Sequence, residues 1–376
     1  MSNEMVIPYD WVATKMNHWY VAIKNNWVKT AEERKEEVKK EIALMEENQD
    51  VLLYFSLLEF RHELMLDYLY PDVKRDIEKR YEELKTTRRS KNLNGKLEYY
   101  YHFFMGMYYF RQKELIHCLN FYRIAEQELD SIEGEEVEKA EFYFKMSEVF
   151  YHMKQTYFSM HYARRAYHIY RNDPSYGGRQ VHCQFVISGN WLDNMRNEEA
   201  LKHAKQALED AEKLGENYLI RKALFNVGLC YDKLEEYANA SLYYKKSLDI
   251  QEPENLNYQA RTLFMMAFNE GKQNNLENAK EFYKKSKKLA KQCREETVLE
   301  KLKMVKGLYL SPNLDLLRET FQYFEKTNMY PDMEWYGVFI GDFLSSKREL
   351  MGANEFYRKA IDARIKIQRG ELLLEV

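Results

Sequence analysis

The sequence has 376 residues, of which 45% are hydrophobic and 31% are charged, and its formal net charge is −3 at pH 7. This near balance of charge excludes a protein dedicated to binding nucleic acid through a basic surface. The chain holds only 14 glycines and 6 prolines, which favours long helices joined by short loops over a β-rich fold. We therefore expect an all-α protein.

Residues 9 to about 70 predict three helices. The second is expected to begin at Thr30, because Thr30 and Glu33 match a capping box. The third runs from about Asp50 to Tyr70, and apolar residues surround most of it, so we expect it to be the central helix of a bundle. In the first helix, the residues that mark one buried face are Val12, Met16, Trp19, Tyr20, Ile23 and Trp27.

The third helix is preceded by a polar run, Glu46 to Asp50. The run has two interpretations. It is a capped turn, in which Asp50 caps the helix and Glu46 interacts with the helix dipole, or it presents polar chemistry to a partner.

Residues 71–92 are highly charged with little apolar periodicity, and they predict a helical or partly flexible linker. From about residue 93 the chain repeats, and residues 223–248 carry small and aromatic residues at the offsets of a tetratricopeptide unit. Successive units follow at spacings of 41, 41, 40, 39, 38 and 36 residues, and the unit around Leu317 is the least regular. Their alignment positions are Cys118, Ser159, Ala200, Ala240, Ala279, Leu317 and Ala353.

These signals predict three parts: a three-helix bundle over 1–70, a linker over 71–92, and a repeat domain over 93–376. The repeats should form a right-handed solenoid of about seven helix pairs, whose concave wall is lined by the first helix of each pair. Such walls bind extended peptides or helices.

The four cysteines lie 65, 47 and 63 residues apart, which is not the spacing of a metal or redox motif. The N-terminus lacks a basic region followed by an apolar stretch, so we expect no signal peptide. The apolar run at 51–58 is too short to span a bilayer. We therefore expect reduced thiols and a cytoplasmic location.

Five segments carry a family resemblance. They are HWYVAIKNNW, MEENQDVLLYFSLLEFRHELMLDY, LEYYYHFFMGMY, EKAEFYFKMSEVFYHMKQTYFSMHYARRA and NVGLCYDKLEEYANA. They resemble the Rap proteins, the response regulator aspartate phosphatases of sporulating Gram-positive bacteria. The resemblance covers essentially the whole chain. It implies a bundle that engages a response regulator and a repeat array that binds a short, secreted and re-imported Phr peptide, which switches the bundle off in quorum sensing.

In the phosphatase members, a glutamine in the motif EE-Q-D orients a water against the aspartyl phosphate. This sequence reads EENQD, so the resemblance assigns that role to Gln49 and regulator contacts to Glu46 and Asp50. An acyl phosphate is already activated, so positioning a water is most of what catalysis needs. Two alternatives remain: a non-catalytic inhibitor that sequesters a regulator's DNA-binding domain, and a peptide-sensing scaffold with another partner.

The repeat frame places Asn226 and Asp193 toward the concave wall. An asparagine there can bond a peptide backbone, and an aspartate suits a basic side chain or an amine. The resemblance supports Asn226, Asp193 and the nearby Asn190 as peptide anchors, although a buried amide satisfied by a neighbouring repeat is the alternative. The apolar residues that point inward by the same frame are Phe185, Phe225 and Leu229.

Two Glu-x-x-His pairs, Glu59 with His62 and Glu114 with His117, have the spacing used by di-iron bundles. They fall in different predicted domains, and chance pairs are common in a chain rich in glutamate. We expect His62 on the bundle surface, and no metal site or cofactor. Basic clusters such as Lys284–Gln292 alternate with apolar and acidic residues, so we expect solvated helix faces and no direct nucleic-acid contact.

Overall fold

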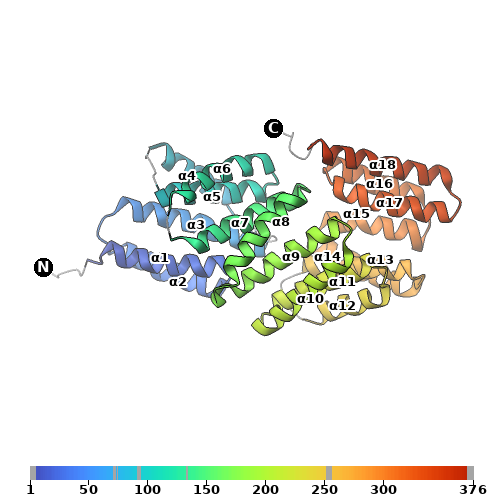
Figure 1. Cartoon of the computed structure of the whole chain (residues 1–376), viewed down its shortest axis with the longest axis horizontal. Coiled ribbons are helices and arrows are strands. Elements are labelled where there is room, and N and C mark those ends of the chain that lie inside the picture. Colours follow the sequence, from blue (N-terminus) through green and yellow to red (C-terminus); the bar gives the residue numbers. More distant parts are fainter. Residues whose placement is uncertain are drawn as a thin grey trace. The chain divides into compact units, whose positions relative to one another are not determined.

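The structure is a computed structural model that describes residues 6–70, 73, 75–90, 95–132, 134–250 and 256–370, and the side chains of 87–90 are outside that description. Within these ranges the chain is a succession of α-helices, and its extended pairing is a single bridge between Ile7 and Met45 (Figure 1). The predicted all-α class is confirmed. Among the described residues, none of the helices combines the length and apolar character needed to cross a membrane.

The first four helices are α1 (Tyr9–Lys24), α2 (Val28–Ile42), α3 (Gln49–Leu69) and α4 (Ile77–Ser90). Seven consecutive helix pairs follow, as the repeat pattern predicts. They are α5 (Gly95–Arg111) with α6 (Leu115–Asp130), α7 (Glu136–His152) with α8 (Thr156–Tyr170), α9 (Gly177–Asp193) with α10 (Asn197–Leu214), α11 (Asn217–Lys233) with α12 (Tyr237–Asp249), α13 (Leu256–Lys272) with α14 (Leu276–Gln292), α15 (Glu296–Val305) with α16 (Leu314–Lys326), and α17 (Tyr330–Ser346) with α18 (Leu350–Gln368). A 3₁₀ turn, Pro174–Tyr176, precedes α9, and a π-helical turn, Lys306–Leu310, follows α15.

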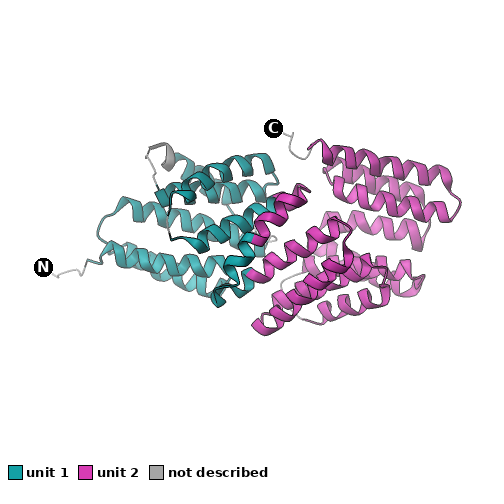
Figure 2. Ribbon diagram, in the orientation of Figure 1, with its two compact units in different colours: residues 1–149, 165–179 teal, residues 150–164, 180–376 magenta. Residues whose placement is uncertain are grey.

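The helices belong to two compact units (Figure 2). The first contains residues 1–149 and 165–179, and the second contains residues 150–164 and 180–376. The division runs through α7, α8 and α9. A functional division at residues 70 and 93 stays a prediction, and the described part of the predicted linker includes helix α4.

In the first unit, most of the predicted apolar face of α1 is buried, and Val12, Met16, Trp19 and Ile23 have no exposed surface. Trp27 is the exception, because α1 ends at Lys24 and Trp27 is the 42% exposed residue before α2. Two further expectations for this region are wrong. Helix α2 begins at Val28, so Thr30 lies inside it and no side chain caps it. His62 is fully buried, because it lies on the side of α3 that meets Trp19 of α1.

The predicted alignment positions of the repeats are all buried, from Cys118 to Ala353. Small residues are needed where the helices of a pair come close. A Cβ atom built on Gly228 of α11 would lie 2.7 Å from the fully buried ring of Tyr244 on α12. The irregular repeat near Leu317 coincides with the π-helical turn at the end of α15.

Candidate functional site

The predicted regulator-contact residues lie together at the exposed start of α3. Gln49 is the first residue of the helix, and Glu46, Gln49 and Asp50 are all exposed. The helix cap is Asn48, whose Oδ1 accepts hydrogen bonds from the N–H groups of Asp50 and Val51 at 3.1 Å each. The expectation that Asp50 caps the helix is therefore wrong, and its carboxylate is an exposed charge in the first turn.

The segment before α3 is held by the N-terminal strand-like residues. The Ile7 N–H donates to the Leu44 carbonyl, and the Glu46 N–H donates to the Ile7 carbonyl, each at 3.0 Å. Gln49 Nε2 donates to Glu47 Oε1 at 3.0 Å. The Asn48 cap and the bridge at Ile7 fix the backbone on which Gln49 stands, so its amide is presented from an ordered platform.

Sequence reasoning missed three exposed apolar side chains of the first unit, which we call the apolar rim. Val6, Trp11 and Leu44 are 63%, 60% and 52% exposed. Trp11 lies in the first turn of α1. Val6 and Leu44 flank the bridge between Ile7 and Met45. Large exposed apolar side chains next to a polar group are typical of a protein-binding surface. The exposure of Val6 and Leu44 depends on the side of the bridge to which each side chain points, which the periodicity of the sequence does not reveal.

In the second unit, α9 carries three of the predicted peptide residues. Phe185 is half-buried, and its ring lies 6.0 Å from that of His182. Asn190 is fully buried, and its Nδ2 donates to Ser159 Oγ at 2.8 Å and to the Val186 carbonyl at 3.0 Å. These contacts are those of the alternative raised for Asn190, a buried amide bonded within the repeats.

Asp193 is the last residue of α9 and is exposed. Lys154 Nζ lies 2.8 Å from both of its carboxylate oxygens. A ligand cation at Asp193 must therefore compete with an ion pair already formed, although such partly exposed pairs contribute little stability.

Helix α11 carries the other three predicted residues, and all of them are half-buried. Phe225 packs against Tyr244 and Tyr258, with ring centroids 5.5 Å apart in both cases. Leu229 packs against the main core of the second unit. The amide of Asn226 makes no hydrogen bond within the described residues, so its donors and acceptor are available to solvent or a ligand.

Beyond Asn226, the end of α11 carries a lysine that the sequence did not single out. Lys233 Nζ lies 3.4 Å from the ring centroid of Trp335, and burial lowers the pKa of Lys233 to about 7. The neighbouring Asp232 forms a buried ion pair with Lys272 at 2.8 Å. Trp335 is more than 100 residues away in sequence, so no local pattern predicts this contact.

Within the described ranges, no group of three or more His, Cys, Asp or Glu side chains is arranged to hold a metal ion. The two Glu-x-x-His pairs do not come together at a metal site. Glu59 lies 3.3 Å from Arg80, and His117 lies 3.0 Å from its own motif partner Glu114, the residue before α6. The four cysteines are buried free thiols.

Comparison with known proteins places these features in context. The family model described as response regulator aspartate phosphatase H, N terminal, matches residues 6–67, and a tetratricopeptide repeat model matches residues 192–252.

The chain is similar along its length to proteins of Bacillus subtilis (strain 168). It is 42% identical over 370 residues to response regulator aspartate phosphatase I, covering 98% of this chain and 94% of the relative. It is 34% identical over 377 residues to the regulatory protein RapF, covering 99% of each. A crystal structure of a Rap protein complexed with competence and sporulation factor is similar with a TM-score of 0.86 at 38% identity, covering 96% of this chain and 100% of that one.

Proposed function

Because this chain belongs to the Rap family, we propose that it hydrolyses the aspartyl phosphate of a response regulator and that a short Phr-type peptide switches this activity off. The relative at 42% identity is named a response regulator aspartate phosphatase, and the structure at 38% identity is that of a Rap protein complexed with competence and sporulation factor. The observation that carries the proposal is this full-length similarity, together with an exposed Gln49 on a capped helix start.

Gln49 is the proposed catalytic residue. Its amide has both a donor and an acceptor, so it can hold a water in line with the phosphorus of an acyl phosphate. Little else is needed, because positioning supplies most of the acceleration when the leaving group is already activated. The Asn48 cap fixes the turn that carries Gln49, which limits the entropy lost when the water is positioned.

The regulator is proposed to contact the surface around Gln49. Glu46 and Asp50 are exposed carboxylates beside the glutamine, and they favour a partner that is basic around its phosphorylation site. The apolar rim of Val6, Trp11 and Leu44 supplies the surface that association buries.

The peptide is proposed to bind along α9 and α11 of the second unit. Asn226 is the backbone anchor, because its half-buried amide is not engaged by other described residues. Asp193 is the anchor for a cationic group. Apolar contacts to the peptide come from Phe185, Phe225 and Leu229. Asn190 contributes indirectly, because its hydrogen bond to Ser159 holds α9 against α8. A cytoplasmic location is part of the same proposal, since response regulators act inside the cell.

The competing function is a non-catalytic inhibitor that sequesters a regulator's DNA-binding domain. One observation favours it: RapC of Bacillus subtilis (strain 168), which is similar to this chain over the full length, is named a regulatory protein. A decisive experiment measures loss of phosphate from a panel of phosphorylated receiver domains and, separately, binding to the matching DNA-binding domains.

We expect at least one receiver domain to lose phosphate faster with the protein than without it. Gln49→Ala should abolish this acceleration, whereas Gln127→Ala, which removes an exposed glutamine of α6, should leave it intact. Loss of phosphate at the spontaneous rate with every receiver domain, combined with binding to a DNA-binding domain, would establish the non-catalytic function.

A further inference from the structure

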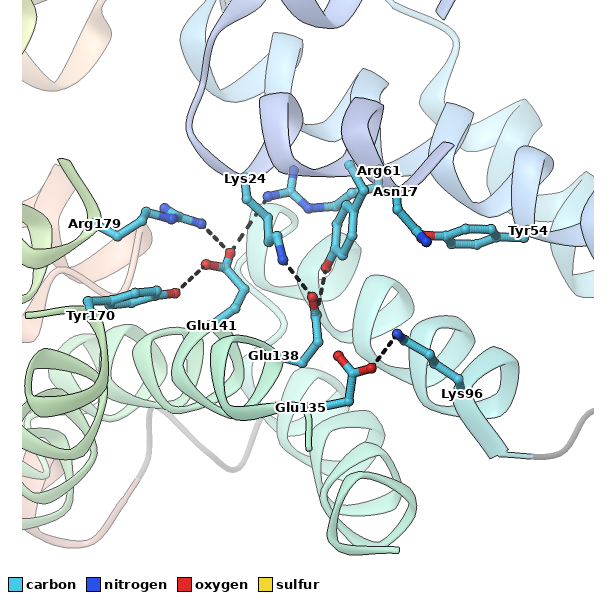
Figure 3. Close-up of polar contacts among 11 residues, drawn as sticks. Asn17, Lys24, Tyr54, Arg61, Lys96, Glu135, Glu138, Glu141, Tyr170 and Arg179 are labelled. Carbon is cyan, nitrogen blue, oxygen red and sulfur yellow. Dashed lines mark hydrogen bonds and ion pairs between the residues drawn. The ribbon is translucent and has the colours of Figure 1, made fainter. Parts of the chain in front are cut away.

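Two carboxylates of α7, Glu138 and Glu141, are buried in the first unit, with 4% and 0% of their surface exposed. They are three residues apart and therefore lie on the same side of the helix. Side chains from α1, α3, α8 and α9 converge on them (Figure 3). The proposed function does not use this cluster, and charged groups are rarely buried so deeply unless they are paired.

Glu138 binds α1. Lys24 Nζ lies 2.5 Å from Glu138 Oε1, and the Tyr20 hydroxyl donates to Glu138 Oε2 at 3.3 Å. Lys24 is 4% exposed and Tyr20 is 2% exposed, so this contact is closed to water. The carboxylate offsets the cost of burying the ammonium group, and the pKa of Lys24 is raised despite its burial.

Glu141 joins three more helices. Arg179 of α9 donates to Glu141 Oε1, Arg61 Nη2 of α3 lies 3.8 Å from the same oxygen, and the Tyr170 hydroxyl of α8 donates to Oε2 at 2.8 Å. The Arg61 Nε atom is buried without a hydrogen-bond partner among the described residues. Burial opposes the charge of Glu141, but Arg179, Lys145 and Arg61 outweigh it, and the pKa of Glu141 is lowered.

The balance of charge makes this cluster conditional. Two carboxylates face three cations, Lys24, Arg61 and Arg179, and all five are at least 95% buried. Losing one partner leaves a buried charge uncompensated, which costs free energy. Separating the whole cluster returns every charge to water, so each charge regains its hydration energy. These costs favour a contact that either stays complete or opens as a unit.

The contact between α1, α3 and α5 is also made by side chains that water can solvate when the helices separate. Tyr20 of α1 and Tyr54 of α3 pack on Tyr100 of α5 with ring centroids 5.3 and 5.4 Å apart. Tyr54 also donates to Asn17 at 3.0 Å (Figure 3). Tyrosines tolerate exposure better than purely apolar side chains because the hydroxyl can bind water.

We infer that the cluster of Lys24, Arg61, Glu138, Glu141 and Arg179 is a lock that docks α1 and α3 on α7 and on the first turn of α9. Helix α3 begins with Gln49, and α9 continues to Asp193. Glu141 therefore connects the helix of the proposed catalytic residue to a helix of the proposed peptide site. The docking stands on the contacts alone, whereas its regulatory use rests on the proposed function.

The test measures the docking directly in the full-length chain. Spin labels are attached to cysteines introduced at Lys39→Cys on α2 and Gln127→Cys on α6, two exposed positions of the first unit. The four native cysteines are buried, and the protein without added cysteines checks that they stay unlabelled. Pulsed electron resonance should give one narrow distance distribution for the parent, and Glu138→Gln or Glu141→Gln should each add a longer-distance population.

Two further variants separate release of the lock from misfolding. Lys24→Met combined with Glu138→Gln removes both charges of one pair and should restore the narrow distribution, because no buried charge is left unpaired. Glu136→Gln breaks a more exposed pair with Lys139 on the same helix and should change nothing. If Glu138→Gln and Glu141→Gln fold, by circular dichroism, and keep the parent distribution, the lock does not exist.

Whether the lock regulates activity is tested by the rate at which a receiver domain loses its phosphate, with a receiver domain that the parent protein dephosphorylates. Glu141→Gln should change that rate by threefold or more, and Glu136→Gln should not. Equal rates in parent and Glu141→Gln overturn the regulatory use. If the parent itself dephosphorylates nothing, the proposed function fails, and the spin-label distances still decide whether the lock exists.

Discussion

At the scale of single residues, His62 shows how surroundings override residue type. A histidine between Arg61 and Glu63 in sequence suggests a surface position, yet the ring is fully buried and accepts a hydrogen bond from Trp19 Nε1 at 3.1 Å. Burial lowers the pKa of His62 to about 3, with help from the charges of Lys35, Arg61 and Arg75. The imidazole is therefore neutral in the folded protein at neutral pH.

This shift predicts a loss of stability in mild acid. Below the ordinary histidine pKa of about 6.5, the unfolded chain takes up a proton that the folded chain refuses, so the free energy of unfolding falls as pH drops from about 6.5 toward 3. Protonation of His62 in the unfolded chain should lower the free energy of unfolding by about 2 kcal/mol between pH 6.5 and pH 5. Urea unfolding at both values should show a smaller loss for His62→Gln, which can still accept from Trp19. Equal losses would contradict the assignment.

At the scale of elements, the turns within the helix pairs share a backbone feature that the residue pattern hides. One residue of most of these turns adopts a positive φ although it is not glycine: Lys113, Lys154, Met195, Glu235, Asn274 and Arg348. They recur with the period of the repeats. The left-handed conformation costs a side chain about 1 kcal/mol, so the packing of each pair imposes the turn on whatever residue occupies it.

Met195 offers a test of this imposed conformation, because its φ is 58° and its side chain is 82% exposed. Met195→Gly should raise the free energy of unfolding by up to about 1 kcal/mol, since relief of the strain exceeds the added entropy of the unfolded chain. Met351→Gly is the matched control, because Met351 is 90% exposed in the first turn of α18. It should lower stability, by less than the roughly 1 kcal/mol that glycine costs in a helix interior. Denaturant midpoints measure both, and a destabilised Met195→Gly would contradict the prediction.

At the scale of the whole molecule, the two proposed activities lie in different units. Gln49 belongs to the first unit, and Asn190 and Asn226 belong to the second. The two asparagines differ in their surroundings. Asn190 is buried and bonded to Ser159, whereas Asn226 is half-buried with its amide unengaged among the described residues.

Replacing the two asparagines with alanine should therefore have different effects. Asn226→Ala should abolish inhibition by short peptides from a synthetic library while leaving stability and receiver dephosphorylation unchanged. Asn190→Ala should lower the free energy of unfolding by about 1–3 kcal/mol, because it removes a fully buried amide that donates hydrogen bonds to Ser159 Oγ and to the Val186 carbonyl. Calorimetric melting and a dephosphorylation assay with and without peptide separate the two. Loss of dephosphorylation in Asn226→Ala would contradict the division of labour.

The sequence by itself determined the all-α class, the seven helix pairs and the polar start of α3. These follow from local physics, because helical periodicity, scarce glycine and proline, and recurring small residues act over a few turns of chain. It also singled out Gln49, Asn226 and Asp193, whose positions depend on the repeat frame or on a local motif.

Only the tertiary structure decided the surroundings of those residues. Some of these surroundings depend on partners that are distant in sequence: the burial of His62 and Asn190, the contact of Lys233 with Trp335, and the convergence of Lys24, Arg61 and Arg179 on α7. The cap formed by Asn48 depends on the detailed path of the backbone. Desolvation and charge pairing act through space, so a pattern along the chain cannot specify them.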